Sequence, residues 1–404
     1  MKLSPPESVD LGHLCYCANI HPGESWDETR AALGRFLPLV KARISPDAPF
    51  GVGLRLSALA AQQLEQQAPL LAEFQQFLAR HQFYVFTING FPYGRFHGAK
   101  VKEQVYQPDW RHPARLEYSN RLARLLTALL PKDQPELNGS ISTVPGAFAA
   151  HLADAGGLDL IIGQLLAHIA ELHRLHMESG RQIQLALEPE PGCLLETCDD
   201  AIRLFQQRLL SPDTLAELAR LCSCPANHAE TLLRRHLGLC LDCCHAAVEF
   251  EDIETSLNRL RQAGIAIAKL QLSAGLRLPS LHKRHEPALQ AFAEDAYLHQ
   301  VVQQANGQLT RFNDLPEAMA RLDAAYGAEW RIHFHVPLWA ERFGELESTR
   351  DQVERLLALH RAHPVSRHLE VETYSWGVLP ETYRSMPLED NLARELAWVK
   401  EKLQ

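Results

Sequence analysis

Short apolar runs rich in β-branched and aromatic residues alternate along the whole chain with longer stretches whose apolar residues recur at helical spacing. This alternation is typical of parallel βα units, in which a helix follows each strand and returns the chain to the same edge of the sheet. It predicts an α/β fold, a single (β/α)8 TIM barrel. Nine runs qualify as strands, one more than such a barrel needs: HLCYCANIH, FGVGLRLS, QFYVFTING, GSISTVPG, IQLALEPE, LGLCLDCCH, IAIAKLQLS, RIHFHVPL and HLEVETYSW.

Two helices have ends that the sequence marks clearly. Residues 158–179 place apolar side chains on one helical face and stop at Gly180, a residue suited to the left-handed position that follows a helix. Thr349, with Gln352 three residues later, predicts a capping box at the start of a later helix, which must end before Pro364.

One stretch does not follow the alternation. Residues 275–328 contain two polar, strand-like segments, YLHQVVQQ and GQLTRF, on either side of Asn306-Gly307, a dipeptide typical of tight hairpin turns. We expect this stretch to be an insertion after the seventh strand. Because no internal repeat, low-complexity tract or flexible linker is evident, we expect one domain over residues 1–404.

Composition narrows the environment and the partners. A formal net charge of −9 and a pI near 6.1 disfavour nucleic acid as a partner, because phosphate contacts require clustered lysine and arginine. Residues 1–13 lack a basic segment followed by an apolar run, and the chain has no apolar stretch of membrane-spanning length. Nine cysteines without regular spacing fit reduced thiols. We therefore expect a cytoplasmic protein with a small-molecule substrate and no membrane insertion.

Polar residues close several of the predicted strands, where the active site of a barrel lies. The most informative are two carboxylates, Glu188 and Glu372, and the run Asp242-Cys-Cys-His245. A carboxylate inside an apolar barrel costs several kcal/mol unless it is paired or bound to a metal ion. Their convergence therefore predicts a divalent cation. Further strand-end residues on shared faces are Glu190, Lys269, Gln271, His333, His335 and Glu370.

Plainer interpretations exist for each of these residues. A single Glu after a strand is usually solvated or ion-paired, and His333 and His335 could be histidines of the core. Cys240, Cys243 and Cys244 raise the alternative of a thiolate zinc site. No second C-x-x-C lies at zinc-ribbon spacing, however, and buried cysteines commonly behave as small apolar residues.

The order Glu188, Asp242-x-x-His245, Gln271, Glu372 resembles the signature of xylose isomerase-like barrels, which include hydroxypyruvate isomerase, ketose 3-epimerases and nucleases of the endonuclease IV type. The resemblance implies one metal ion held by Glu188, Asp242, Gln271 and Glu372. The run KLQLSAGLRLPSLHKRHEP is also similar to the segment after strand seven of hydroxypyruvate isomerases, which favours Gln271 over a histidine as the ligand on that strand.

The ligand set bears on the identity of the metal. Carboxylates with an amide suit Mn²⁺ or Mg²⁺, whereas participation of His333 or His335 would indicate Zn²⁺. His245 is expected either to lie next to the ligands or to bind a second ion together with these two histidines.

Five segments are similar, at a finer level, to the EboE family, whose members are described as acting in metabolite traffic and are encoded with other Ebo proteins in bacterial clusters. They are CYCANIHPGESW, FTINGFPYGRFHG, KEQVYQPDW, HFHVPLW and VETYSWGVLP. This resemblance implies processing or export of a cytosolic precursor of a secondary metabolite, without a settled reaction.

These observations lead to the hypothesis of a metal-dependent isomerase or epimerase acting on a small hydroxy-carbonyl metabolite, with Glu188 and Glu372 as the proton-transfer groups. Two alternatives stay open, a phosphodiesterase of the endonuclease IV type and a non-catalytic barrel that binds a metabolite in an export pathway. Assembly into a homo-oligomer is left open as well. The residues expected to contact the substrate are Lys269, Arg277, His97 and Trp376.

Overall fold

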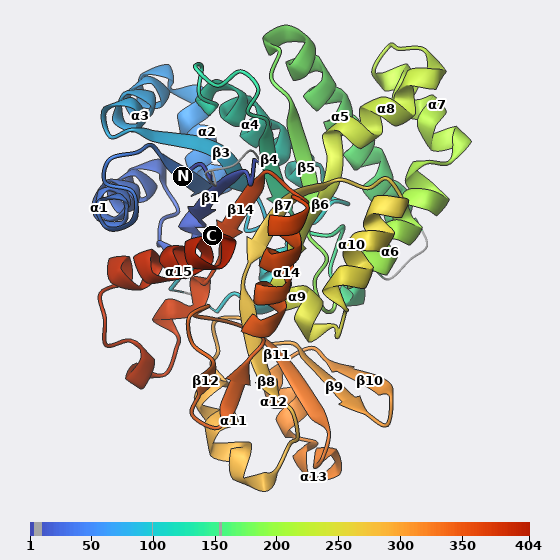
Figure 1. Ribbon diagram of the computed structural model, residues 1–404. Coiled ribbons are helices and arrows are strands. Elements are labelled where there is room, and N and C mark those ends of the chain that lie inside the picture. The colour runs from blue at the N-terminus through green and yellow to red at the C-terminus, as the bar shows by residue number, and fades with distance from the viewer. Residues whose placement is uncertain (4–9, 99, 153–155) are drawn as a thin grey trace.

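Eight of the nine predicted strands pair in parallel in one sheet that curves into a barrel (Figure 1). The structure is a computed structural model that describes residues 1–3, 10–98, 100–152 and 156–404, so part of the N-terminal segment considered above lies outside the described residues. A parallel bridge between Cys17 and Gly53 joins the two edge strands, which confirms the (β/α)8 barrel. Its strands are β1 (His13–Tyr16), β2 (Phe50–Arg55), β3 (Phe83–Asn89), β4 (Gly139–Thr143), β5 (Ile183–Leu187), β6 (Leu237–Asp242), β7 (Ile267–Leu272) and β14 (His368–Val371).

Helices surround this barrel and cover its apolar outer face (Figure 1). The predicted helix that stops at Gly180 is confirmed, since α5 ends at Ser179 and Gly180 has a φ of 72°. No helix within the described residues is long and apolar enough to cross a membrane. The barrel helices are α1 (Trp26–Ile44), α2 (Ala58–Gln66), α3 (Ala68–Arg80), α4 (Pro113–Leu129), α5 (Gly157–Ser179), α6 (Cys198–Leu204), α7 (Pro212–Leu221), α8 (Ala226–His236), α9 (Cys243–Val248), α10 (Ile253–Gln262), α14 (Arg350–Ala362) and α15 (Leu388–Leu403).

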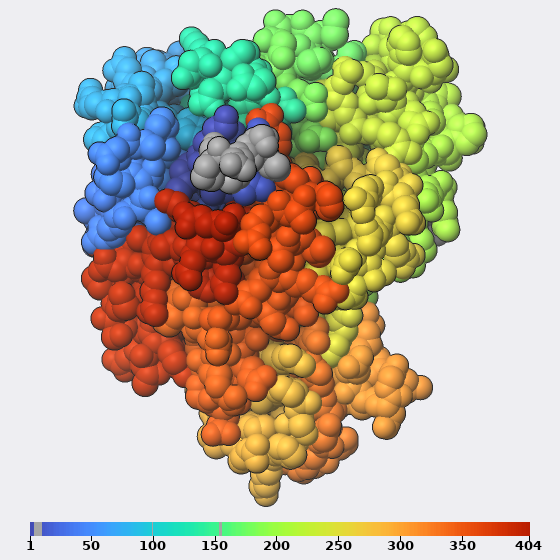
Figure 2. Space-filling model, viewed as in Figure 1, coloured from blue at the N-terminus to red at the C-terminus, as the bar shows by residue number. Residues whose placement is uncertain are grey.

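The ninth predicted strand, β11 (Glu329–Val336), lies outside the barrel in a second, antiparallel sheet that is inserted after β7. Figure 2 shows the insertion as a lobe that projects from the barrel. The predicted turn is confirmed, because Asn306 and Gly307 both have positive φ, 50° and 76°, between β9 and β10. The other elements here are β8 (Ala274–Leu278), α11 (Glu286–Phe292), β9 (Val301–Ala305), β10 (Gln308–Phe312), α12 (Leu315–Met319), α13 (Leu322–Ala325), β12 (Arg342–Phe343) and β13 (Leu346–Ser348).

The two ends of this second sheet are tied to one another. The amide of Gly275, at the start of β8, donates to Oγ1 of Thr349 at 2.8 Å, and the amide of Thr349 donates back to the carbonyl oxygen of Gly275 at 2.9 Å. The predicted capping box is therefore wrong: α14 does begin after Thr349, but the hydroxyl is already used by Gly275, and the amide of Gln352 bonds to the backbone oxygen of Thr349. Because β8 leaves from the carboxyl end of β7, the second sheet stands at the barrel end where the polar residues lie.

The interior of the barrel holds a buried ion pair. Nζ of Lys269 on β7 lies 2.5 Å from Oε2 of Glu370 on β14, and both side chains are fully buried. Gly53 makes room for this pair, since a Cβ there would lie 1.8 Å from Oε1 of Glu370. Burial opposes the charged lysine, but Glu370 more than offsets it and raises the pKa of Lys269.

Candidate metal centre

Three carboxylates meet at the carboxyl end of the barrel. Glu188 follows β5, Asp242 ends β6 and Glu372 follows β14, and oxygen atoms of the three lie within 4.8 Å of one another. All three side chains are buried, with residue exposures of 2%, 1% and 4%. The carboxyl ends of neighbouring parallel strands share one edge of a sheet, which explains why residues so far apart in the chain converge.

Two of these carboxylates have an oxygen without a partner. Oδ1 of Asp242 accepts hydrogen bonds from the amide of His245 at 2.9 Å and from Oγ of Ser273 at 2.7 Å. Oδ2 of Asp242 and Oε2 of Glu188 are buried and have no hydrogen-bond partner among the described residues. A buried polar atom left without a partner is costly, so these two oxygens are the ones that an ion would satisfy.

The third carboxylate, Glu372, is held by side-chain amides. Its Oε1 accepts from Nδ2 of Asn19 at 2.5 Å and from Nδ2 of Asn89 at 2.9 Å. Its Oε2 accepts from Nε2 of Gln271, whose amide oxygen in turn accepts from Sγ of Cys240 at 2.9 Å. Gln271 thus lies in the cluster, as a donor to Glu372, and its amide would have to turn over before its oxygen could bind a metal ion.

The charges of this cluster call for a counter-ion. Burial raises the pKa of Glu188 well above its usual range, and the neighbouring Glu372 and Asp242 raise it further. Burial also raises the pKa of Glu372, and Asp242 adds to that effect. Three carboxylates this close cannot all be ionised in a low-dielectric interior without a cation among them. Their oxygen-rich donor set fits a divalent ion such as Mn²⁺ or Mg²⁺.

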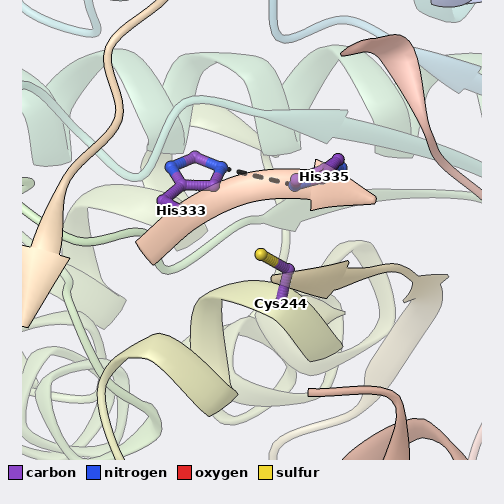
Figure 3. Close-up of side chains that lie close together, drawn as sticks. All are labelled: Cys244, His333 and His335. Atoms are coloured by element: carbon purple, nitrogen blue, oxygen red, sulfur yellow. Dashed lines mark hydrogen bonds between the residues drawn. The ribbon is translucent and has the colours of Figure 1, made fainter. Parts of the chain in front are cut away.

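Three histidines stand beside the carboxylates. His245 comes from α9, while His333 and His335 come from β11 of the second sheet and share one face of that strand (Figure 3). Nε2 of His333 lies 3.1 Å from Nε2 of His245 and 3.3 Å from Nε2 of His335. Burial lowers the pKa of His245 to about 4 and that of His333 well below its usual range, so both rings are neutral near pH 7.

A chain of hydrogen bonds supports the central histidine. Nδ1 of His333 faces Oε1 of Gln300 at 2.7 Å, and Nε2 of Gln300 donates to the hydroxyl of Tyr106 at 2.8 Å. That hydroxyl donates to Oε1 of Glu190 at 2.8 Å. Burial raises the pKa of Glu190 to about 8, and its Oε2 has no partner among the described residues.

The cysteines near the site are buried thiols with raised pKa values. Cys244 lies within 4.8 Å of ligand atoms of His333 and His335, but it comes from α9 beneath the strand that carries them (Figure 3). Burial raises the pKa of the Cys244 thiol, and Asp242 raises it further; burial likewise raises the pKa values of Cys240 and Cys243. These thiols are therefore protonated in the metal-free protein.

A cavity opens from this centre to the surface. Its empty volume is about 520 Å³ when its open mouth is included. Its floor is polar, with Glu188, Glu372 and the histidines. Lys102 is the only lysine or arginine among its described lining residues, and its Nζ lies 2.7 Å from Asp314. The mouth is mostly apolar and is lined by Phe91, Pro92, Phe96, Val101, Val105, Tyr297, Leu298 and Tyr374.

The four residues expected to contact the substrate lie away from this cavity. Lys269 is engaged with Glu370 inside the barrel, and Nε of Arg277 on β8 donates to Glu329 at 2.8 Å. The indole N–H of Trp376 points to Glu395. His97 stands behind the cavity wall, where its Nε2 donates to the backbone oxygen of Asn19 and its Nδ1 accepts from the hydroxyl of Tyr297 at 2.8 Å.

Several residues of the centre were not anticipated. Asn89 is the last residue of β3, and Asn19 comes shortly after β1, so the rule of polar residues at strand ends would have found both. Tyr106 and Gln300 carry no such signal, because Tyr106 ends a short 3-10 helix (Lys102–Tyr106) after β3 and Gln300 lies in the insertion.

No family model and no curated protein matches this chain. Among solved structures it is similar to a zinc-bound IolI protein (13% identity, 97% of this chain and 98% of that one, TM-score 0.49). It is also similar to AsbF of Bacillus anthracis, a probable 3-DHS dehydratase (13%, 96% and 97%, 0.43), and to the Escherichia coli 3-keto-D-glucoside 4-epimerase YcjR (12%, 96% and 99%, 0.44). A likeness this remote assigns neither a reaction nor a ligand to this chain.

Proposed function

We propose that this protein is a metal-dependent isomerase or epimerase of the xylose isomerase-like type, acting on a small hydroxy-carbonyl compound. The observation that carries the proposal is the convergence of Glu188, Asp242 and Glu372, with two buried oxygens that have no partner in the described part of the chain. Their order along the chain, with Gln271 between Asp242 and Glu372, is the order of ligands in that superfamily.

All three carboxylates would bind the ion, and two of them, Glu188 and Glu372, are also candidates for proton transfer. A divalent ion bound here would polarise the carbonyl and hydroxyl oxygens of the substrate. Asp242 and Glu372 would hold the ion, because Asp242 is fixed by Ser273 and the amide of His245, and Glu372 by three amide donors. Glu188 lines the cavity and would bind the ion through Oε2, which leaves its other oxygen as the first candidate to take a proton from one carbon and return it. Glu372 is the second candidate, which an epimerase would need on the opposite face of the substrate.

The shape of the cavity bears on the substrate. An apolar mouth without a free lysine or arginine among its described lining residues disfavours a phosphorylated sugar and favours a neutral compound that carries an apolar group. The formal net charge of −9 disfavours DNA as the substrate of the phosphodiesterase alternative, because contacts along a nucleic acid require clustered lysine and arginine.

The five segments that are similar to the EboE family support a place in metabolite processing. Each contributes at least one residue to the lining of this cavity, namely Asn19, Asn89 with Phe91 and Phe96, Val105 with Tyr106, His333 with His335, and Glu372 with Tyr374. Segments that lie far apart in the chain and meet at one cavity are typical of a site where all of them contact the same ligand. We therefore infer that a cytosolic metabolite precursor occupies it.

Solvent exchange tests the proposed reaction. Purified protein loaded with Mn²⁺ is incubated in D₂O with a panel of ketoses and of hydroxy-ketones that carry apolar groups, and each recovered compound is analysed by mass spectrometry. Deuterium at the carbon next to the carbonyl is expected for at least one compound, and Asp242→Asn should abolish it. Absence of deuterium from every compound, with metal bound, would favour the non-catalytic binding barrel.

A further inference from the structure

The protons of the three histidines can be assigned from their partners. Nδ1 of His245 lies 3.0 Å from the carbonyl oxygen of Pro189, and Nδ1 of His335 lies 2.9 Å from that of Glu372. A carbonyl oxygen can only accept, so both Nδ1 atoms must carry the hydrogen. A neutral imidazole has one N–H, and therefore Nε2 of each ring is a bare acceptor.

The same assignment holds for the third ring. Nε2 of Gln300 donates to the carbonyl oxygen of Pro191 at 3.0 Å, which fixes the orientation of the amide. Oε1 of Gln300 must then be the atom that faces Nδ1 of His333 at 2.7 Å. His333 thus also carries its hydrogen on Nδ1, and three acceptor nitrogens converge with no hydrogen between them.

The spacing of these nitrogens matches that of ligands around one ion. Zinc binds histidine nitrogen at about 2.0–2.1 Å with tetrahedral geometry, which puts two ligands about 3.3 Å apart. The observed separations are 3.1 Å for His245 and His333 and 3.3 Å for His333 and His335. Lone pairs at this distance repel one another unless a cation lies among them.

Oxygen ligands to complete the set are within reach. Oδ2 of Asp242, which lacks a partner, lies 4.0 Å from Nε2 of His335, and an oxygen of Glu190 lies within 4.8 Å of ligand nitrogens of His245 and His333. Separations near 4 Å are too long for hydrogen bonds but are compatible with two ligands of one ion.

We propose that His245, His333 and His335 form a second metal site, suited to zinc, next to the carboxylate site, and that Asp242 lies between the two ions. Imidazole nitrogens suit zinc and other transition metals, whereas carboxylates and amides suit harder ions. Two of the three ligands, His333 and His335, come from β11, so the inserted sheet supplies histidine ligands that the ends of the barrel strands do not provide. The ion at the carboxylates belongs to the proposed function, and the inference rests on that function for this ion alone. The site at the histidines is argued from their own geometry.

Cobalt provides the direct test. Metal-free protein is titrated with Co²⁺, and its visible spectrum and the ions bound per chain are recorded. Wild type should bind two ions, one with the strong absorption of tetrahedral Co²⁺. His333→Asn should lose that absorption and one ion, whereas Glu188→Gln should keep the absorption. His360→Asn, which replaces a buried histidine on α14, is the matched control and should behave as wild type. Gln300→Leu should weaken binding at this site by about 10- to 100-fold, because it removes the partner that orients His333.

A second measurement needs no variant. In ¹⁵N-labelled wild type, Zn²⁺ should shift the Nε2 signals of three histidines while their Nδ1 atoms keep hydrogen. The proposal would be overturned if the wild-type spectrum lacked the absorption of tetrahedral Co²⁺. It would also be overturned if His333→Asn folded and bound cobalt as wild type does. Either result can be distinguished from failure of the proposed reaction, because that reaction is tested separately by deuterium incorporation into the substrate.

Discussion

Two oxygen atoms define the centre at the scale of single residues. Oε2 of Glu188 and Oδ2 of Asp242 are buried and have no partner among the described residues, whereas Oδ1 of Asp242 accepts from the amide of His245 and from Oγ of Ser273. A protein interior tolerates such atoms where a ligand completes them. The metal-free state should therefore be less stable than the loaded one.

Metal binding should raise the stability of the wild type. Mn²⁺ at 100 times its dissociation constant should add about 2.7 kcal/mol to the free energy of unfolding, because the ion binds only the folded chain. Glu188→Gln should gain much less from Mn²⁺, and without metal it should be at least as stable as wild type, since a neutral amide avoids the cost of ionising a buried carboxyl beside Asp242 and Glu372. Urea unfolding with and without Mn²⁺ measures both effects. Equal stabilisation of the two proteins would contradict this account of Glu188.

The sequence allows some of these residues to be predicted and not others. Glu188, Asp242 and Glu372 close apolar strands, so their convergence follows from the barrel itself. The position of Lys269 was predictable, but its pairing with Glu370 was not, because the neighbouring strand β14 lies about a hundred residues further along the chain. Whether a polar strand-end residue faces a substrate or another side chain depends on such distant partners.

The inserted sheet is the main feature at the scale of elements. Its hairpin was predicted because Asn306-Gly307 is a local signal. The pairing of β11 with β8 and β9 was not, because RIHFHVPL has the same apolar pattern as a barrel strand. The strands with which a segment pairs are determined by tertiary contacts, and the apolar pattern of that segment alone does not reveal them.

The closure of this sheet depends on one hydroxyl. Thr349→Val should lower the free energy of unfolding by about 1–3 kcal/mol, because it leaves the buried amide of Gly275 without an acceptor. Thr349→Ser keeps the hydroxyl and serves as the control, with a smaller loss expected. Urea unfolding of the three proteins measures the difference. If the valine and serine variants were equally stable, the hydroxyl would not hold the two ends together.

The last helix joins the parts of the whole molecule. Glu395 on α15 accepts hydrogen bonds from the amide of Leu338, just after β11, at 3.1 Å and from Oγ1 of Thr373, just after β14, at 2.7 Å. The side chain is fully buried, and burial raises its pKa to about 7. The carboxyl group therefore binds its proton more tightly in the folded chain than in the unfolded one.

Stability should consequently fall as pH rises. A raised pKa means that the contribution of Glu395 is fully present below the pKa of the unfolded chain and is lost as pH rises through about 7. The difference is on the order of 3 kcal/mol for a shift of this size. Relative to Glu395→Gln, wild type should lose this amount between pH 4 and pH 8 in urea unfolding. A pH-independent difference between the two proteins would show that this carboxyl group does not change its protonation.

The central claim is that the barrel end binds a divalent metal ion through its three carboxylates, and the metal content of the purified protein tests it most directly. Wild type, Glu188→Gln and Asp242→Asn are stripped with chelator, reloaded with Mn²⁺, passed through a desalting column and analysed for metal per chain. Wild type should retain at least one ion, and both variants should retain distinctly less. If all three folded proteins retained equally little metal, the carboxylates would not form the site.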